Sequence, residues 1–233
     1  NLLPYAEKML DLASEARAIV AGGEVPTGTL KITAPETVCT YRFPTLLRQF
    51  RQRFPQVKLL FRPYPLADIR RGVNEGDIDV AFVLEEPLHS TSLVIENLVP
   101  EPLYLLAAPD YPLANLPILH TSDLEGEPFL LTEAGCSYRH TLERALNEAG
   151  VHASTNLDFI SVEAIKQCAI AAMGITFLPA ITVRQELEEG RLVILNWEQR
   201  SFGVITQMLW HKDKWLSPAL QAFLGVAREV LKP

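Results

Sequence analysis

The chain has 233 residues, of which 48% are apolar and 21% charged, a composition that indicates a folded globular protein and excludes a disordered one. The net charge of −7 at pH 7 gives no sign of the basic surface that nucleic-acid binding requires, so we expect this segment alone to bind DNA poorly. No apolar run approaches the ~18 residues of a membrane span, and no secretion signal is recognisable, so we expect no membrane partner.

The first predicted element is a helix over residues 1–21 with two neighbouring apolar stripes at spacings of three and four. One stripe is interrupted only by Arg17, and the other is uninterrupted. Two stripes make a face too broad for a helix that lies half in water. The helix therefore either packs on its own domain or pairs with another subunit, with Arg17 at a polar position of the seam. Glycines and a proline follow at residues 22–28 and indicate a linker.

Residues 28–62 predict a strand, a loop, a helix and a second strand. Residues 30–34 alternate apolar and polar side chains, Pro44 suits the first turn of a helix, and Pro55 ends it. The loop after the first strand of such a unit lies at the carboxyl edge of a parallel sheet, where open α/β sheets bind ligands. We therefore expect residues 35–41 to line a small-molecule pocket.

The chain continues with a helix that ends at Gly76, a buried strand over residues 77–83, and strands over 94–98 and 103–108. Residues 109–128 are rich in proline and turn-forming residues and predict a crossing into a second lobe.

The second half repeats the same pattern. A strand over 129–132, a loop over 133–137 and a helix ending at Gly150 come first, and further strands and helices follow to residue 231. Two α/β lobes with a cleft between them are the simplest architecture, and helix starts from both lobes converge on the cleft. Hydroxyls and free backbone donors at helix starts favour anions, although each hydroxyl alone is more often a plain cap. The hydroxyls concerned are those of Thr37, Thr40, Ser137 and Ser161.

The cysteines and histidines give no metal or catalytic signature. Three widely spaced cysteines lack the short spacings of a zinc site or a redox dithiol and indicate free thiols in the reducing cytoplasm. The five histidines are scattered, and no phosphate loop, nucleophile elbow or zinc-protease motif is present. We expect no metal, no cofactor, no catalytic residue and no enzymatic activity.

Cys136 is open to two interpretations. It precedes a helix and has Arg139 nearby, features that lower the pKa of a thiol, and His140 lies one turn away. A catalytic role requires a positioned base or a resolving thiol, and the sequence identifies neither. A thiol that lines the pocket is favoured over a reactive one. Cys39 and Cys168 lie on or beside apolar helix faces and are expected in the core.

The order of elements resembles the regulatory part of LysR-type transcriptional regulators over nearly the whole chain. The residues that carry this resemblance are GTLKI at 28–32, FPTLLRQFRQRFPQVKL at 43–59, EGDIDVAFV at 75–83, AAPDYPLA at 107–114, ISVE at 160–163 and AMGITFLP at 172–179. The resemblance implies an α/β fold of two Rossmann-like lobes with a central cleft, like a type 2 periplasmic binding protein, preceded by a linker helix. It implies a linker and dimerisation helix over 1–24, a first lobe over 25–106 plus 208–233, and a second lobe over 107–207.

The resemblance also implies partners. A small, polar or anionic effector binds in the cleft and controls transcription by a full-length bacterial regulator. In that protein a winged helix-turn-helix precedes the linker helix and supplies all DNA contacts. Dimers or tetramers form through the linker helix and the lobes, and RNA polymerase is a further partner of the full-length protein.

By position, the effector pocket of the family falls on eleven residues of this chain. Pro35 removes a backbone donor and Glu36 adds negative charge at the mouth, so carboxylate binding requires Arg42, Arg62 or Arg139 to offset it. The expected effector-binding residues are Pro35, Glu36, Thr37, Tyr64, Pro65, Cys136, Ser137, Arg139, Ser161, Val162 and Pro179.

Two other classes of function share parts of this pattern. A solute-binding receptor of a transport system has the same fold, but a monomeric receptor has no use for the two-stripe helix. A thiol-dependent sensor or enzyme would use Cys136.

Overall fold

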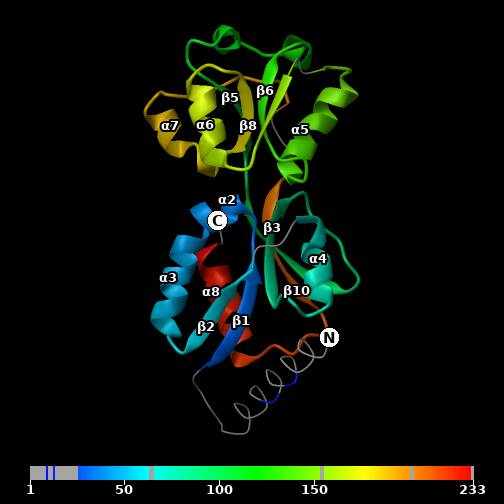
Figure 1. Cartoon of the computed structure of the whole chain (residues 1–233), viewed down its shortest axis with the longest axis vertical. Coiled ribbons are helices and arrows are strands. Elements are labelled where there is room, and N and C mark those ends of the chain that lie inside the picture. Colours follow the sequence, from blue (N-terminus) through cyan, green and yellow to red (C-terminus); the bar gives the residue numbers. More distant parts are fainter. Residues whose placement is uncertain are drawn as a thin grey trace.

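A computed structural model describes residues 9, 13, 26–62, 66–152, 155–199 and 202–231. The helix expected over residues 1–21 lies outside the described residues except for Met9 and Ala13, which are both helical. Tyr64 and Pro65 also lie outside them. The described chain forms two lobes stacked along the long axis of the molecule, each built around one sheet (Figure 1). The predicted two-lobed α/β architecture is confirmed.

The first lobe contains a five-stranded sheet of order β2-β1-β3-β10-β4. Its strands are β1 (Gly28–Thr33), β2 (Val57–Phe61), β3 (Val80–Glu85), β4 (Leu93–Pro100) and β10 (Ile205–His211). β1 pairs in parallel with β2 and β3, whereas β10 is antiparallel to β3 and β4. Its helices are α2 (Glu36–Tyr41), α3 (Phe43–Arg53), α4 (Leu66–Asn74) and α8 (Pro218–Val230). Figure 1 shows α3 and α8 on one side of this sheet and α4 on the other.

The second lobe has the same plan, with a sheet of order β7-β6-β8-β5-β9. Its strands are β5 (Leu103–Ala107), β6 (Pro128–Thr132), β7 (Thr155–Phe159), β8 (Ile175–Pro179) and β9 (Val193–Ile194). β6 is parallel to β7 and β8, and β5 is antiparallel to β8. The α-helices α5 (Ser137–Glu148), α6 (Val162–Ile170) and α7 (Arg184–Glu188) flank the sheet, α5 on the side opposite α6 and α7. Short 3₁₀ helices are η1 (Pro112–Asn115), η2 (Thr121–Leu124) and η3 (Ala180–Thr182).

Local chemistry explains why the elements begin where they do. Pro44 occupies the first turn of α3, where its missing N–H costs no hydrogen bond. Ser217 caps α8, since its hydroxyl oxygen accepts a hydrogen bond from the Leu220 N–H at 3.1 Å. The predicted strand, loop, helix and strand over 28–62 are confirmed, with a short additional helix, α2, in the loop.

The chain crosses between the lobes earlier than the sequence suggested. β5 lies wholly in the second sheet and β10 wholly in the first, so the crossings fall near Glu101 and Val204 rather than after residues 106 and 207. The backbone N–H of Glu101 donates to the Val204 carbonyl at 2.9 Å, which joins the two crossing segments. Residues 109–128, expected as the crossing, instead carry η1 and η2 within the second lobe. Antiparallel pairing of β5 with β8 is a tertiary contact that local proline positions do not reveal.

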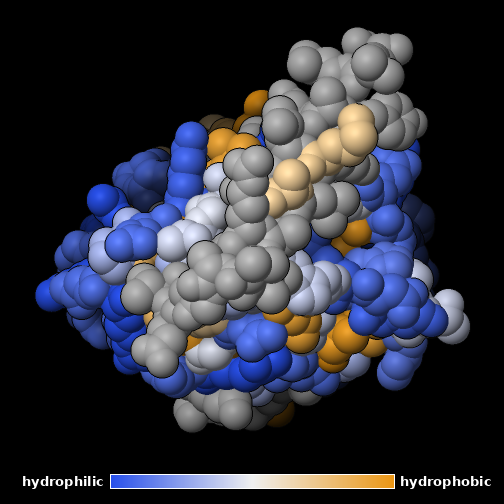
Figure 2. All heavy atoms as spheres, turned by 90° about the horizontal axis from the view of Figure 1, so that it is seen from below, coloured by the Kyte–Doolittle hydropathy of each residue, from blue (hydrophilic) through white to orange (hydrophobic). Residues whose placement is uncertain are grey.

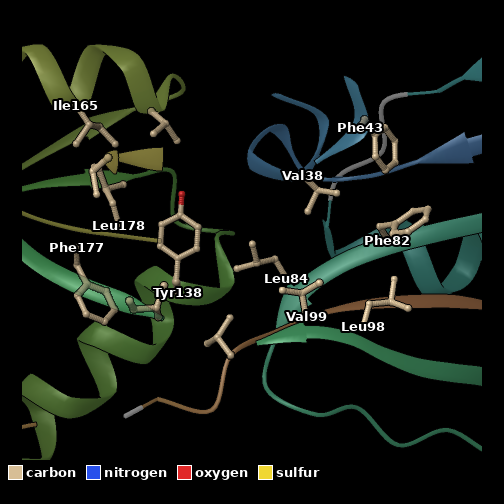
Figure 3. Close-up of a cluster of buried hydrophobic side chains, with 14 of the residues drawn as sticks. Val38, Phe43, Phe82, Leu84, Leu98, Val99, Tyr138, Ile165, Phe177 and Leu178 are labelled. Atoms are coloured by element: carbon tan, nitrogen blue, oxygen red, sulfur yellow. The ribbon is translucent and has the colours of Figure 1, made fainter. Parts of the chain in front are cut away.

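One continuous hydrophobic core runs through both lobes. Figure 3 shows Val38 and Leu84 of the first lobe facing Tyr138 of the second, with Phe43 and Phe82 behind them. The rings of Phe43 and Phe82 meet edge to face at 5.0 Å between centroids. Separating the lobes would expose these apolar side chains to water, so the structure favours small shifts between lobes over wide opening.

The exterior is mostly polar. Seen from the end of the first lobe, the surface that is not drawn in grey is predominantly hydrophilic, with apolar groups in several separate places (Figure 2). Among the described residues, no helix is both long and apolar enough to span a membrane. The same part of the chain holds no group of three or more histidine, cysteine or acidic side chains placed to bind a metal ion.

Candidate interlobe effector site

A cavity of about 660 Å³ lies between the two lobes, within the usual size range of small-molecule sites. The first lobe supplies the end of β1, α2, the end of β2, α4 and the end of β3, and the second lobe supplies the loop from β6 to α5 and the residue after β7. The lining residues are Ala34, Pro35, Glu36, Thr37, Cys39, Phe61, Ile69, Leu84, Glu133, Gly135, Cys136, Ser137, Tyr138 and Ile160.

The cavity lies where two equivalent turns face each other. β1 ends at Thr33, and the extended Pro35 precedes α2; β6 ends at Thr132, and the extended Cys136 precedes α5. Both turns therefore lie at the carboxyl ends of parallel strands, the position at which open α/β sheets bind ligands. Of residues 35–41, which the sequence predicts to line a pocket, Pro35, Glu36, Thr37 and Cys39 line this cavity.

Five of the eleven expected site residues line this cavity, namely Pro35, Glu36, Thr37, Cys136 and Ser137. Arg139, Ser161, Val162 and Pro179 are not among its lining residues. Tyr64 and Pro65 lie outside the described residues.

Arg139 is turned away from the cavity. Its side chain is buried, and its Nε donates to Glu143 at 2.6 Å while Nη1 donates to Asp158 at 2.8 Å and to the Thr132 carbonyl at 2.5 Å. These contacts link α5 to β6 and β7. The guanidinium therefore neither faces a ligand nor activates the Cys136 thiol.

Ser161, Val162 and Pro179 of the second lobe are not among the residues that line the cavity. Ser161 is exposed at the start of α6 and makes no side-chain cap, whereas Val162 is buried in the core. Pro179 ends β8, where its carbonyl accepts the Thr182 hydroxyl at 2.8 Å. Ile160, which is 89% exposed, lines the cavity where Ser161 was expected.

Two of the predicted hydroxyls connect the lobes. The Ser137 hydroxyl of α5 donates to the Leu84 carbonyl at the end of β3. The Thr37 side chain of α2 hydrogen-bonds Tyr138 of α5, and both residues are buried. The starts of α2 and α5 therefore converge on the cavity, whereas Thr40 and Ser161 are exposed and do not line it. The Thr37 and Ser137 hydroxyls are already used in contacts between the lobes.

Neither cysteine at the cavity has the lowered pKa of a reactive thiol. Burial raises the pKa of Cys39 to about 11, followed by the effect of the nearby Glu36 carboxylate, and its Sγ donates to the Ala34 carbonyl at 3.3 Å. Burial likewise raises the pKa of Cys136. Cys39 was expected in the core, but it is half-buried and lines the cavity because α2 presents one of its faces to the second lobe.

We expect both thiols to react slowly with iodoacetamide at pH 7.5. A pKa raised by two units reduces the thiolate fraction of Cys39 roughly a hundredfold relative to a free cysteine. Mass spectrometry after timed labelling measures the rate at each site, with the denatured chain as the reference. Labelling of native Cys136 at or above the reference rate would contradict this account and favour the reactive-thiol alternative.

The charges at the cavity are acidic. Glu36 and Glu133 line it from opposite lobes, and burial, followed by repulsion from Glu133, raises the pKa of Glu36. None of the described lining residues is arginine or lysine. The three arginines expected to offset Glu36 do not line the cavity: Arg42 pairs with Glu101, Arg139 pairs within the second lobe, and Arg62 is exposed beyond β2.

Sequence reasoning missed the apolar walls and Glu133. Phe61, Ile69 and Leu84 have the same periodic spacing as core residues, and a cavity wall and a core face give identical patterns. Glu133 and Gly135 lie in the loop before α5, whose position in the sequence matches that of the first-lobe loop. The matching positions of the two loops are therefore the sequence signal that could have identified Glu133 and Gly135.

Comparison with known proteins agrees with this architecture. Residues 23–232 match the LysR substrate binding domain family. The chain is 42% identical to the "uncharacterized HTH-type transcriptional regulator YwqM" of Bacillus subtilis, covering 98% of this chain and 78% of that protein. It is 30% identical to the HTH-type transcriptional regulator GltR of the same organism, covering 98% of this chain and 75% of GltR.

Solved structures have the same fold. The regulatory domain of CcmR from Synechocystis PCC6803, in complex with 2-PG, superposes with a TM-score of 0.79 at 27% identity, covering 88% of this chain and 98% of CcmR. The effector binding domain of QuiR in complex with shikimate gives 0.73 at 15% identity over 88% of this chain and 98% of QuiR, a likeness in fold alone.

Proposed function

Because the chain belongs to the LysR substrate-binding domain family, we propose that its interlobe cavity binds a small-molecule effector and thereby controls transcription by a longer regulator. The observation that carries this proposal is the cavity itself, of about 660 Å³ and lined by the loops before α2 and α5 of opposite lobes. A ligand that contacts both loops has a different affinity for each arrangement of the lobes, which is the requirement for a switch.

The contacts around α2 supply a route from the cavity to the crossings. Glu36, Thr37 and Cys39 of α2 line the cavity, and Arg42 follows directly and donates two hydrogen bonds to Glu101 in the crossing. A ligand that displaces α2 thus acts on the segment that sets the angle between the lobes. Because one core spans both lobes, we expect a shift of the lobes rather than wide opening.

The partners follow from the same proposal. We expect residues 1–24 to form a connector that pairs subunits into dimers or tetramers, and the lobes to add further contacts. The proposed lobes are residues 25–101 with 204–233, and 102–203. DNA contacts would come from a module outside this chain, with RNA polymerase as a partner of the full-length regulator in the cytoplasm.

Among the alternatives, the solute-binding receptor shares the fold, but the matched relatives cited above are transcriptional regulators. A monomer in solution at micromolar concentration would favour the receptor. The thiol-dependent alternative is opposed by the raised pKa of Cys136.

A thermal-shift screen of metabolites tests the proposal, with Thr37→Val and Ser161→Ala as matched variants. A true effector raises the Tm of the wild-type domain. Thr37→Val removes the contact with Tyr138 that joins the lobes at the cavity, which disfavours the binding arrangement of the lobes and weakens effector binding by about three- to tenfold. Ser161→Ala removes a hydroxyl that does not line the cavity and leaves the affinity unchanged. An effector whose binding responds to Ser161→Ala but not to Thr37→Val would contradict the cavity assignment.

A further inference from the structure

Two carboxylates face the interlobe cavity without a cationic partner. Glu36 comes from α2 of the first lobe and Glu133 from the loop before α5 of the second. Their charges repel, as the raised pKa of Glu36 reflects after burial itself. Within the described part of the chain, neither carboxylate lies within ion-pair distance of a lysine, arginine or histidine. Other acidic residues nearby are paired, Glu101 with Arg42 and Glu186 with Lys166.

The positive charge of Lys166 lowers the pKa of Glu36. Two other carboxylates, those of Glu163 and Glu186, already pair with this ammonium. Its Nζ lies 2.7 Å from Glu163 and 2.9 Å from Glu186. The loop that lies outside the described residues between β2 and α4 has the sequence Pro63-Tyr64-Pro65, which carries no basic side chain. Both cavity carboxylates are exposed and have no ion-pair partner among the described residues, so a cationic ligand can pair with them.

The cavity offers few free donors to an anion. The Ser137 hydroxyl donates to Leu84, the Cys39 thiol donates to Ala34, and the Thr37 side chain bonds Tyr138. The helix starts that attract anions elsewhere already have an acidic residue beside them, Glu36 in the first turn of α2 and Glu133 three residues before the cap of α5. An anionic ligand would meet two like charges and no lysine or arginine among the described lining residues.

The remaining walls are apolar and partly aromatic. Phe61, Ile69 and Leu84 come from the first lobe, and Tyr138 and Ile160 from the second. Such walls gain free energy by covering hydrocarbon, and aromatic faces also attract cations.

We propose that the effector is an organic amine, with a cationic nitrogen held between Glu36 and Glu133 and an apolar body packed against Phe61, Leu84 and Tyr138. This inference rests on the proposed effector function and specifies its ligand class. Glu36 and Glu133 lie on opposite lobes, so one cationic group that binds both stabilises the arrangement in which the two carboxylates are closest. The amine then acts as the link that couples binding to the position of the lobes.

Two matched sets of probes test the charge of the ligand: 3-phenylpropylamine, 3-phenylpropionate and 3-phenylpropanol, and hexylamine, hexanoate and hexanol. Calorimetric titration of the whole chain at pH 7.5 is expected to give amines a Kd at least about tenfold lower than that of the matching carboxylates, with the alcohols between them. Glu36→Gln and Glu133→Gln should each weaken amine binding by at least about threefold and narrow the preference over the carboxylate.

Glu148→Gln is the control variant, because it makes the same change in net charge at the far end of α5. It should leave the amine preference unchanged. Carboxylates that bind as tightly as amines, no amine binding at millimolar concentrations, or amine affinities unmoved by both cavity substitutions would each overturn the amine inference.

The broad metabolite screen separates this failure from failure of the proposed function. If an anionic effector binds there and Thr37→Val weakens it, the effector function stands and the amine inference is wrong. If no small molecule binds in the cavity at all, the effector function itself fails.

Discussion

Replacing Arg42 with methionine is expected to lower the free energy of unfolding by about 3–5 kcal/mol. The Glu101 side chain is 2% exposed and accepts hydrogen bonds from Arg42 Nε at 3.0 Å, Arg42 Nη2 at 2.9 Å and Thr206 Oγ1 at 2.7 Å. Without the guanidinium, a carboxylate remains buried beside the crossing between the lobes with one neutral donor. Removing one member of a buried pair leaves the desolvation cost of the other uncompensated.

Thermal and urea unfolding measure this change, and a fall in Tm of about 10 °C is expected for a domain of this size. Arg42→Lys retains the charge but not the bidentate hydrogen bonding to Glu101, so the free energy of unfolding should fall less, by about 1–2 kcal/mol. Arg53→Met removes the exposed pair with Glu229 and should cost less than about 0.5 kcal/mol. Equal losses of unfolding free energy in Arg42→Met and Arg53→Met would contradict a larger contribution from the buried ion pair.

A second large loss, again about 3–5 kcal/mol, is expected for Lys166→Met in α6. Lys166 Nζ donates to the buried Glu186 at 2.9 Å, and the other carboxylate oxygen of Glu186 has no hydrogen-bond partner. The same ammonium hydrogen-bonds Tyr41 of the first lobe. The substitution therefore leaves the buried Glu186 carboxylate with only the longer 3.7 Å ion pair to Arg191 Nη2, and it removes a contact between the lobes.

The pH dependence of this loss is a further check. Burial lowers the pKa of Lys166, but its hydrogen bonds to Glu163 and Glu186 raise the pKa overall. Because the pKa of Lys166 is higher in the folded than in the unfolded protein, its stabilising effect is fully present at any pH below the unfolded-state pKa. The loss of unfolding free energy in Lys166→Met should therefore be constant between about pH 6 and 8. Glu163→Gln, at a carboxylate that is 58% exposed, should cost about 0.5 kcal/mol or less. A Lys166→Met loss no larger than that of Glu163→Gln would contradict the buried-pair account.

The position of the cavity could be predicted because it follows from strand order. A strand that alternates along residues 30–34 and a proline at the start of the next helix fix a turn at the carboxyl edge of a sheet. Pro35, Glu36 and Thr37 lie in or directly after that turn and line the cavity. Local pattern and tertiary position agree here, so the sequence was sufficient.

The partners of Arg139 could not be predicted, because one of them depends on strand pairing. Glu143 lies one helical turn further along α5, a spacing visible in the sequence. Asp158 lies on β7, where the register pairs Leu131 with Asp158 and brings the carboxylate beside the guanidinium. Proximity to Cys136 in sequence suggested a cavity role that this pairing removes.

The ligand class could not be predicted from the sequence either, because it depends on contacts between residues far apart in the chain. The sequence identifies Glu36 as unfavourable for anion binding and offers Arg42, Arg62 and Arg139 to offset its charge. Glu101 holds Arg42 in the crossing, an ion pair that joins residues far apart in the chain. Glu133 adds its charge from the other lobe, which only the folded arrangement reveals.

The central claim, that the cavity between the lobes binds the effector, is tested most directly by titrating one confirmed effector into Gly135→Trp. Gly135 lines the cavity, and a Cβ atom added there meets nothing within 4 Å, so the position accepts a side chain and we expect an indole there to occupy part of the cavity. We predict at least about a tenfold loss of affinity with the Tm of the free protein unchanged, and little loss for Gly135→Ala. Equal affinity of the effector for wild type and Gly135→Trp would contradict the claim.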